Sequence, residues 1–285
     1  MANEIIFSKE GVQVIKVADR VYFRRADWGA KEQCNSGYIL LSDGVAAIDA
    51  STKEGAVEMM EEAAALFGKP ITHVILTHGH WDHADGLPAL IKGGAKNLIA
   101  AEGAVSLLEA NGVKLPEFTL RIADKARFDI DGIGFEAFTF GKAVHSDGDL
   151  FISIPAHNLV FTGDAVSEAP FLFFKNGNAA NWIETLDAME SLGFSTLCVG
   201  HGGVKDGAHY ADQRAYIQAL RDAMRAFIAK SGATDPSEEA GAKAAKEAAG
   251  DPANAGAALA VKINGAEKAI SHMSQVYTLL LEGKG

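Results

Sequence analysis

The amino-acid sequence predicts an α/β fold followed by a helical C-terminal extension. Short apolar runs bounded by glycine and polar turn residues alternate with helical segments as far as about residue 205. A dense cluster of histidines and an aspartate follows one of these runs. After Tyr210 the composition is helical to the end of the chain. We therefore expect an α/β domain over residues 1–210 and a helical extension over residues 211–285, which acts as a lid, a packing element or an oligomer contact.

The composition is typical of a soluble globular protein, because 48% of the 285 residues are hydrophobic and 22% are charged. The net charge of −11 disfavours a nucleic-acid-binding protein, which normally carries a basic face, and fits a protein that acts on small molecules. Residues 1–5 lack a basic segment followed by an apolar one, and no apolar run is long enough to cross a membrane. We therefore expect a cytoplasmic protein without a membrane partner.

The first half of the chain has the pattern of short strands followed by helix–strand units. The turn Ser42-Asp43-Gly44 predicts a hairpin, and Gly68-Lys69-Pro70 ends a helix. Strands are expected at residues 12–15, 21–23, 38–41, 45–48, 71–76 and 97–100, and helices at 51–67, 87–91 and 102–110.

The second half repeats this order without a detectable sequence repeat. Strands are expected at 133–140, 150–154, 159–162 and 196–199, and helices at 182–192, 211–230 and 237–249. A last helix carries apolar residues three and four apart, which form a seam for another helix. We expect this seam to pack on the chain itself, with a homo-oligomer contact as the alternative. Its residues are Leu259, Ile263, Ala266, Ile270, Met273, Tyr277 and Leu280, interrupted by Asn264-Gly265.

Three histidines and an aspartate lie together in Thr77-His78-Gly79-His80-Trp81-Asp82-His83, directly after the apolar segment 71–76. Imidazole and carboxylate groups are common ligands of zinc-like cations. The spacing excludes the helical i, i+4 pattern of zinc proteases. In an extended backbone His78 and His80 point the same way, whereas Asp82 and His83 turn in a second direction as a helix begins. One loop can therefore serve two metal ions side by side.

Four further ligand-type residues stand at or just past the ends of predicted strands. The ends of packed strands converge along one edge of a sheet, where loops carry functional side chains on a rigid scaffold. Each residue alone is a weak signal, but together with the histidine loop they indicate one site. They are Asp49, His145, Asp164 and His201.

The ordered motifs Asp49, His78-x-His80-x-Asp82-His83, His145, Asp164 and His201 resemble those of the metallo-β-lactamase fold superfamily over residues 12–205. The resemblance implies an αββα sandwich, in which two mixed β-sheets are flanked by helices, with a dinuclear metal site at one edge.

Carried over by motif, the resemblance implies that His78, His80 and His145 hold the first metal ion. It implies that Asp82, His83 and His201 hold the second, that Asp164 bridges the two, and that Asp49 supports the ligands from behind. Two divalent ions are expected, with Zn²⁺ as the expected metal and Fe or Mn as alternatives. Residues that match no ligand motif are Asp147, Asp149, His73, His157, His272 and His209, of which only His209 stays open because it is near His201.

Two cations about 3.5–4 Å apart can share a water and lower its pKa to near 7. This chemistry predicts a dinuclear zinc-type metallohydrolase, in which a metal-bridged hydroxide cleaves an ester, lactone, thioester, amide or related bond of a small molecule. Asp82 is expected to orient the water or to take its proton. The rival function is that of an iron-dependent dioxygenase with the same fold, similar to the persulfide dioxygenases.

The resemblance to individual branches of the superfamily is uneven. The β-lactamases of class B that use a cysteine ligand have it where Asp164 stands, which disfavours that branch. Glyoxalase II enzymes and acyl-homoserine lactonases have the aspartate. However, His145 lies in His-Ser-Asp-Gly-Asp rather than in a Thr-Pro-Gly-His-type context, and no glutathione-binding tail is recognisable. The chain is most similar to poorly characterised hydrolases, including the quinoprotein relay group.

Aromatic residues in or near the predicted loops are expected to line an apolar substrate cleft, with a lysine available for a substrate carboxylate. The alternative is that most of these residues are core. Of the two cysteines, Cys198 is expected in the core and Cys34, in the loop 26–36, near the site as a free thiol rather than as a ligand or nucleophile. The pocket residues are Trp28, Trp81, Phe171, Phe173, Lys175 and Trp182.

Overall fold

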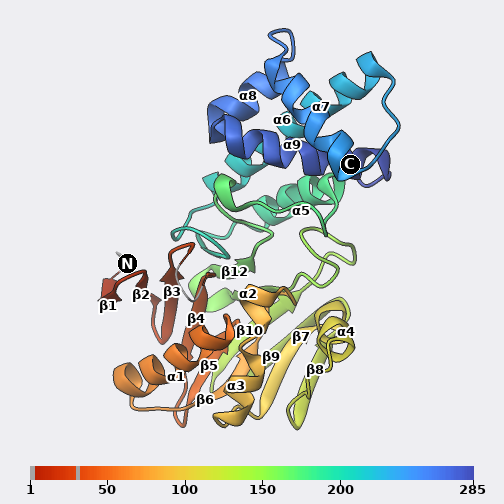
Figure 1. Cartoon of the computed structure of the whole chain (residues 1–285). Coiled ribbons are helices and arrows are strands. Elements are labelled where there is room, and N and C mark those ends of the chain that lie inside the picture. The colour runs from red at the N-terminus through yellow and green to blue at the C-terminus, as the bar shows by residue number, and fades with distance from the viewer. Residues whose placement is uncertain (1–3, 30–32) are drawn as a thin grey trace. The chain divides into compact units, whose positions relative to one another are not determined.

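The computed structural model describes residues 4–29 and 33–285 (Figure 1). Residues 1–3, and residues 30–32 of the predicted loop 26–36, lie outside the described part. The chain forms two compact units, and each is described by itself. Unit 1 comprises the described residues of Met1–Gly141, Gly148–Val166 and Phe194–Asp206, and unit 2 comprises Lys142–Asp147, Ser167–Gly193 and Gly207–Gly285. The domain boundary expected at residue 210 stays a prediction.

The first sheet of unit 1 has eight strands in sequential order within the described residues. The pairs from β1 to β5 are antiparallel and those from β5 to β8 are parallel, so the sheet is mixed. The strands are β1 (Glu4–Lys9), β2 (Val12–Ala18), β3 (Val21–Ala26), β4 (Ser36–Leu40), β5 (Val45–Ile48), β6 (Ile71–Ile75), β7 (Asn97–Ala101) and β8 (Phe118–Ile122).

The second sheet of unit 1 has the order β13-β12-β11-β10-β9. Its strands pair antiparallel except β12 and β13, which are parallel. The strands are β9 (Lys125–Ile130), β10 (Ile133–Phe138), β11 (Phe151–Ile154), β12 (Leu159–Gly163) and β13 (Thr196–Val199), with the short 3₁₀ turn η1 (Pro155–His157) between β11 and β12. Both expected mixed sheets are therefore confirmed.

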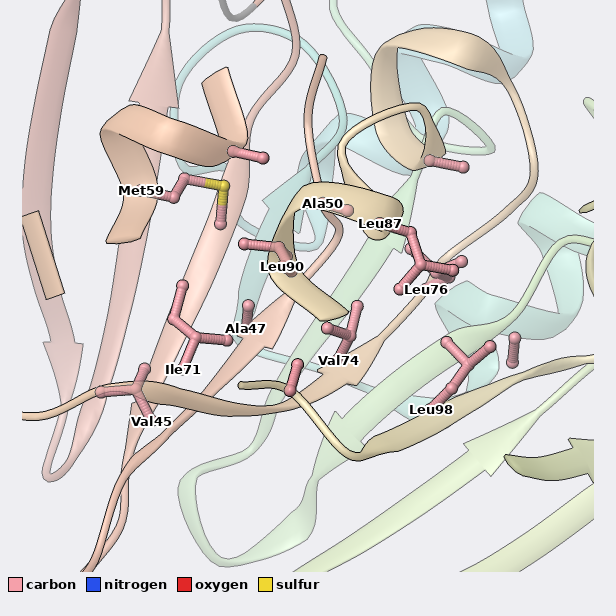
Figure 2. Packing of buried hydrophobic residues seen from close by; sticks show 14 of the residues in the cluster. Val45, Ala47, Ala50, Met59, Ile71, Val74, Leu76, Leu87, Leu90 and Leu98 are labelled. Carbon is pink, nitrogen blue, oxygen red and sulfur yellow. The ribbon is translucent and has the colours of Figure 1, made fainter. Parts of the chain in front are cut away.

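Three helices cover one face of the first sheet. Figure 2 shows Met59, Leu87 and Leu90 from these helices packed against Val45 and Val74 from the strands. All five side chains are withdrawn from water, and such burial contributes about 1.5–3 kcal/mol for each large apolar side chain. The helices are α1 (Lys53–Phe67), α3 (Leu87–Lys92) and α4 (Glu102–Ala110); the one-turn helix α2 (Trp81–Ala84) precedes α3.

The other face of the first sheet packs on the second sheet. Ile48 and Ile75 of the first sheet share a buried core with Phe135, Phe161 and Cys198 of the second. The prediction that Cys198 is a core residue is confirmed. Because β5, β6, β12 and β13 are held in this double layer, the loops that leave them start from rigid positions.

Unit 2 is mainly helical. Helix α6 packs against α8 and α9, and α7 packs against α9. None of the described helices is both long and apolar enough to span a membrane. The elements are α5 (Ala179–Leu192), the 3₁₀ turn η2 (Ala169–Phe171), α6 (Ala208–Ser231), α7 (Glu238–Gly250), α8 (Ala255–Asn264) and α9 (Ala266–Leu281).

The last predicted helix is not continuous. Gly265 has φ 74°, in the left-handed region, and separates α8 from α9. In α9 the seam packs inside the unit, because Met273 and Tyr277 are buried, whereas Leu259 and Ile263 of α8 are 44% and 43% exposed. Packing on the chain itself is thus confirmed for α9. The oligomer contact stays a prediction.

Strands β1, β8 and β9 are absent from the predicted elements. In β9, outward-facing charged side chains such as Lys125 and Arg127 alternate with partly buried ones, so the segment has little apolar content. In β8, Phe118 and Leu120 are exposed at the edge of the sheet. Pairing with a neighbouring strand, rather than local composition, makes these segments strands.

A buried ion pair fixes α1 to the first sheet. Arg24 of β3 is fully buried, and its Nε and Nη2 lie 2.6 Å and 3.1 Å from the carboxylate of Glu62 on α1. Tyr38 donates its hydroxyl to the same carboxylate at 2.7 Å, and Lys9 Nζ lies 3.0 Å away. Burial alone would raise the pKa of Glu62, but the hydrogen bond and charge of Arg24 outweigh it and lower that pKa.

Replacing Glu62→Ala should lower the free energy of unfolding by about 3–5 kcal/mol, because the Arg24 guanidinium would stay buried without its carboxylate. Urea unfolding measures this difference. The matched control is Glu58→Ala, which removes a more exposed partner of Lys9 and should cost less than about 1 kcal/mol. Equal losses in the two variants would show that the buried pair does not hold α1 in place.

A buried polar network joins the elements of unit 2. His272 Nδ1 of α9 lies 2.8 Å from the Tyr216 hydroxyl of α6, and Asn264 Nδ2 donates to that hydroxyl and to Ala169 O, both at 3.0 Å. Burial, together with the charge of Lys268, lowers the pKa of His272 to about 4 from its ordinary value of 6.5. The folded state therefore requires the neutral imidazole.

The free energy of unfolding should fall as the pH is lowered from about 6.5 to about 4, because the unfolded chain binds a proton at His272 that the folded chain still refuses. Above this range the stabilisation that comes from the neutral His272 is fully present. At pH below about 4 it is lost, and the free energy of unfolding is then lower by up to about 3 kcal/mol. Chemical unfolding across this pH range should show a shallower slope for His272→Gln than for the parent. The control His157→Gln should keep the parent slope; an unchanged slope in His272→Gln would contradict the assignment.

Candidate metal centre

The histidine loop is anchored to the sheet through Asp49. This residue directly follows β5 and has a φ of 61°, and its carboxylate accepts from Thr77 N at 2.7 Å and from Thr77 Oγ1 at 2.8 Å. Thr77 is the second residue after β6, so these bonds fix the start of the loop at the edge of the sheet. Asp49 thus lies behind the start of the histidine loop and is bonded to Thr77, which the sequence analysis did not single out. The role of Asp49 in supporting metal ligands stays a prediction.

Asp49 also orients His83. Its Oδ2 lies 2.9 Å from His83 Nδ1, which makes Nδ1 the donor and turns Nε2 the other way. His83 is fully buried on α2, and its Nε2 lies 3.1 Å from Asp164 Oδ1 without the geometry of a hydrogen bond. A buried imidazole nitrogen aimed at a carboxylate in this way fits a site in which both groups bind a cation.

Four buried side chains converge in unit 1: Asp82, His83, Asp164 and His201, whose ligand atoms all lie within 4.8 Å of one another. His201 Nε2 lies 3.2 Å from Asp164 Oδ2 and 3.4 Å from Asp82 Oδ2. Two carboxylates and two imidazoles form a donor set that suits zinc or another divalent ion. The structure therefore brings together the four residues expected at the second metal and its bridge.

The electrostatics of this group also favour a cation. Burial raises the pKa of a carboxylate, but the charges of His201 and His83 outweigh it and hold the pKa of Asp164 well below its usual range. Burial likewise opposes a charged His201, yet Asp164 and Asp82 raise the pKa of that imidazole to about 9. Protons on the histidines thus balance the carboxylates, a part that a metal ion takes over when it binds.

Two glycines permit the close approach of these groups. A Cβ on Gly200 would lie 1.9 Å from Asp164 Oδ1, and a Cβ on Gly163 would lie 2.5 Å from Thr77 Oγ1. Gly163 also has a φ of 50°. Side chains at these positions would displace the Asp164 carboxylate or the Thr77 hydroxyl that anchors the loop. This steric constraint explains why glycine precedes both Asp164 and His201.

His78 and His80 form a second group on the same loop. Their ring centroids are 4.7 Å apart, and the His78 ring lies 4.2 Å from that of His83. His78 is buried and His80 is half-buried, and burial lowers the pKa of His80. Two neighbouring imidazoles beside the four-residue group fit the first of two adjacent metal positions.

His145 belongs to unit 2. Its Nδ1 lies 3.1 Å from Phe173 O, and its ring is 5.6 Å from that of Trp182. The segment is tied down by Asn178 N, which donates to Val144 O at 2.9 Å. The role of His145 as third ligand beside His78 and His80 stays a prediction.

The predicted pocket residues fall in different surroundings. In unit 1, Trp28 and Trp81 are 53% and 51% exposed, and the Trp28 ring lies edge-on to His201 at 5.2 Å. In unit 2, Phe173 is exposed, Phe171 is half-buried, and the exposed Lys175 donates to Glu238 at 2.6 Å.

Trp182 requires a correction. It is fully buried and packs on Phe174 at 5.1 Å between ring centroids, so it is a core residue of unit 2 and not a side chain lining a cleft. Because other aromatic residues lie near it in the sequence, a core position and a cleft-lining position could not be distinguished without the tertiary packing.

The expected lack of a ligand role for the remaining histidines and the cysteines stays a prediction. His209 of unit 2 lies 3.0 Å from Ser167 O, and His73 and His272 also lie outside both ligand groups. Cys34 and Cys198 are free and buried. Cys34 lies near the site as expected, and burial raises the pKa of its thiol to about 11.

Comparison with known proteins agrees with this geometry. Residues 29–201 match the model of the metallo-beta-lactamase superfamily. The chain belongs to that superfamily. Its fold is similar to a metallo-beta-lactamase from Pontibacter korlensis (TM-score 0.65, 18% identity, covering 73% of this chain and 99% of that one). It is also similar to one from Hirschia baltica (TM-score 0.61, 18% identity, covering 72% and 97%).

Two curated relatives are named hydroxyacylglutathione hydrolase. The protein of Ruegeria pomeroyi is 30% identical over 145 residues, which cover 50% of this chain and 53% of the relative. The protein of Jannaschia sp. is 29% identical over 154 residues, which cover 53% and 56%. The chain thus matches about half the length of these relatives.

Replacing Asp49→Asn should weaken zinc binding about 10- to 100-fold, because an amide in place of Oδ2 no longer accepts the His83 Nδ1 proton. Titration of the metal-free chain with zinc against a chelator measures the affinity. Asp131→Asn, at a surface carboxylate that accepts from Ser42, serves as the control and should bind zinc like the parent. Parent-like affinity in Asp49→Asn would contradict the orienting role of Asp49.

Proposed function

We propose that this chain is a metal-dependent hydrolase that cleaves an acyl bond, in a thioester, ester or lactone, of a small molecule. The observation that carries the proposal is the buried group Asp82, His83, Asp164 and His201, whose ligand atoms lie within 4.8 Å of one another. A donor set of this kind, at the edge of a rigid sandwich, suits metal-assisted hydrolysis.

The proposed site holds two divalent ions, with zinc as the expected metal. His78 and His80, together with His145, are the proposed ligands of the first ion; the support for His145 is its place in the ordered motif set. Asp82, His83 and His201 are the proposed ligands of the second, with Asp164 between the two. When bound, the metal pair polarises the electrophilic oxygen of the substrate and acidifies a water.

The protein side chains hold this chemistry in place. Asp82 is 6% exposed, and the charge of His83 keeps its pKa below the ordinary value although burial opposes this. The Asp82 carboxylate is therefore ionised at neutral pH, and we assign to it the orientation of the water and the acceptance of its proton. Trp28 and Trp81, both exposed, offer apolar surface to the substrate.

The relatives support the proposed substrate class. The two relatives named hydroxyacylglutathione hydrolase support a thioester or a similar activated acyl compound as substrate. The proposed localisation is cytoplasmic.

A substrate panel tests the proposal directly. The chain, with its metal content measured, is assayed on thioesters, lactones, β-lactams, and phosphate and sulfate esters. We expect turnover of acyl substrates and about two metal ions per chain. Iron content with oxygen uptake, and no hydrolysis, would instead support the dioxygenase reaction and overturn the proposal.

Removing one imidazole of the buried group tests the proposed second metal position. In His201→Ala we expect the metal content to fall from about two ions to about one and kcat to fall by at least about 100-fold, because one ligand of the second ion is gone. His209→Ala is the matched control, since this histidine is near His201 in the sequence and its Nε2 lies 3.0 Å from Ser167 O. A full metal complement and parent activity in His201→Ala would contradict the site.

A further inference from the structure

The dipeptide Cys34-Asn35 lies directly before β4 and touches both segments that carry the ligands of the second metal position. Cys34 is fully buried and Asn35 is 3% exposed. Neither residue belongs to the two groups of ligand atoms. Their side chains are nevertheless engaged with backbone atoms on either side of those ligands.

Cys34 is bonded to the turn that carries Asp82 and His83. Its Sγ donates to Asp82 O at 2.8 Å, and the thiol also lies beside the His83 imidazole. Asp82 and His83 are neighbours in α2, so a bond to this carbonyl restrains both ligands together.

Asn35 holds the His201 loop, which we define as residues 199–202. Its Nδ2 donates to Val199 O at 2.8 Å and to Gly202 O at 2.9 Å, and its backbone N donates to Gly200 O at 2.9 Å. The remaining polar atom, Oδ1, accepts from Ala26 N at 2.9 Å at the end of β3. Both amide hydrogens and the amide oxygen are therefore used, and the carbonyls on both sides of His201 are restrained.

These two ligand segments come from different sheets. The turn with Asp82 and His83 follows β6 of the first sheet, whereas the His201 loop follows β13 of the second. A metal ion bound by both requires a fixed separation between them, to within a few tenths of an ångström. The adjacent residues Cys34 and Asn35, on one short stretch of backbone, contact one segment each.

We infer that Cys34 and Asn35 are positioning residues, which set the separation between the Asp82-His83 turn and the His201 loop and thereby the affinity for the second metal ion. The inference rests on the proposed function. The first ion depends on His78 and His80 in the loop before α2, so its affinity should change little when the dipeptide is altered.

Zinc titration of the metal-free full-length chain, against a competing chelator, tests this inference in the absence of any substrate. Asn35→Asp keeps the acceptor for Ala26 N but places an oxygen against Val199 O and Gly202 O. We expect the second zinc affinity to fall about 10- to 100-fold and the first to stay within about threefold of the parent.

The Cys34 variants supply an independent pair and a rescue. Cys34→Ser keeps a hydroxyl donor for Asp82 O and should retain the parent affinity within about threefold, whereas Cys34→Ala loses the donor and should weaken the second site about tenfold. Because these substitutions are small, the Cys34 variants test the same inference even if Asn35→Asp fails to fold.

Glu62→Ala is the control for a merely structural role. It destabilises the same unit through the Arg24 ion pair, away from the ligand segments, and should bind both zinc ions like the parent. Parent-like second-site affinity in Asn35→Asp and Cys34→Ala, or the same loss in Glu62→Ala, would overturn the inference while the proposed function stands. A parent chain that takes up no second zinc ion would overturn both.

Discussion

The candidate metal centre depends on the enclosure of two carboxylates, Asp82 and Asp164, away from water at the edge of a β-sandwich. Each is almost fully buried, and His83 and His201 face them at 3.1–3.7 Å. Buried carboxylates are costly unless a positive charge accompanies them. In this chain the counter-charge comes either from protons on the two imidazoles or from metal ions. The rest of unit 1 can be understood as the scaffold that makes this enclosure possible.

The scaffold acts through residues behind the ligands. Asp49 fixes Thr77 and the tautomer of His83, and the dipeptide Cys34-Asn35 contacts the ligand segments of both sheets. These hydrogen bonds end on the loop after β6, on the one-turn helix α2 and on the segment at the end of β13. Because the strands are locked in two apolar cores, small displacements of the ligands are resisted by the whole sandwich. This rigidity is what a metal-assisted reaction requires of its protein.

Unit 2 uses a different device to fix its elements. Its helices have a modest apolar content, and the Tyr216–His272–Asn264 network supplies specific contacts among α6, α8 and α9 and the Ala169–Phe171 turn. A fully bonded buried network specifies one arrangement of the helices, whereas apolar contacts alone allow sliding. The same unit contains His145 and its aromatic neighbours Phe173 and Trp182.

The fold family and the types of the candidate ligands could be inferred from the sequence. The spacing of His78 and His80 in an extended loop is a local signal, whereas Asp164 and His201 stood out only together with that loop and through the resemblance of the ordered motifs. Tertiary structure decided what depends on contacts far apart in the chain. It placed Trp182 in the core, split the last helix at Gly265, and made strands of β8 and β9.

The supporting residues show the same division. Asn35 binds carbonyls more than 160 residues away, and no pattern in its neighbourhood predicts those partners. Cys34 could be expected near the site from its loop, but its bond to Asp82 O depends on how β4 and α2 meet. Ligands are visible in a sequence because their chemistry is unusual, whereas the residues that position them use ordinary hydrogen bonds, whose partners only the folded chain selects.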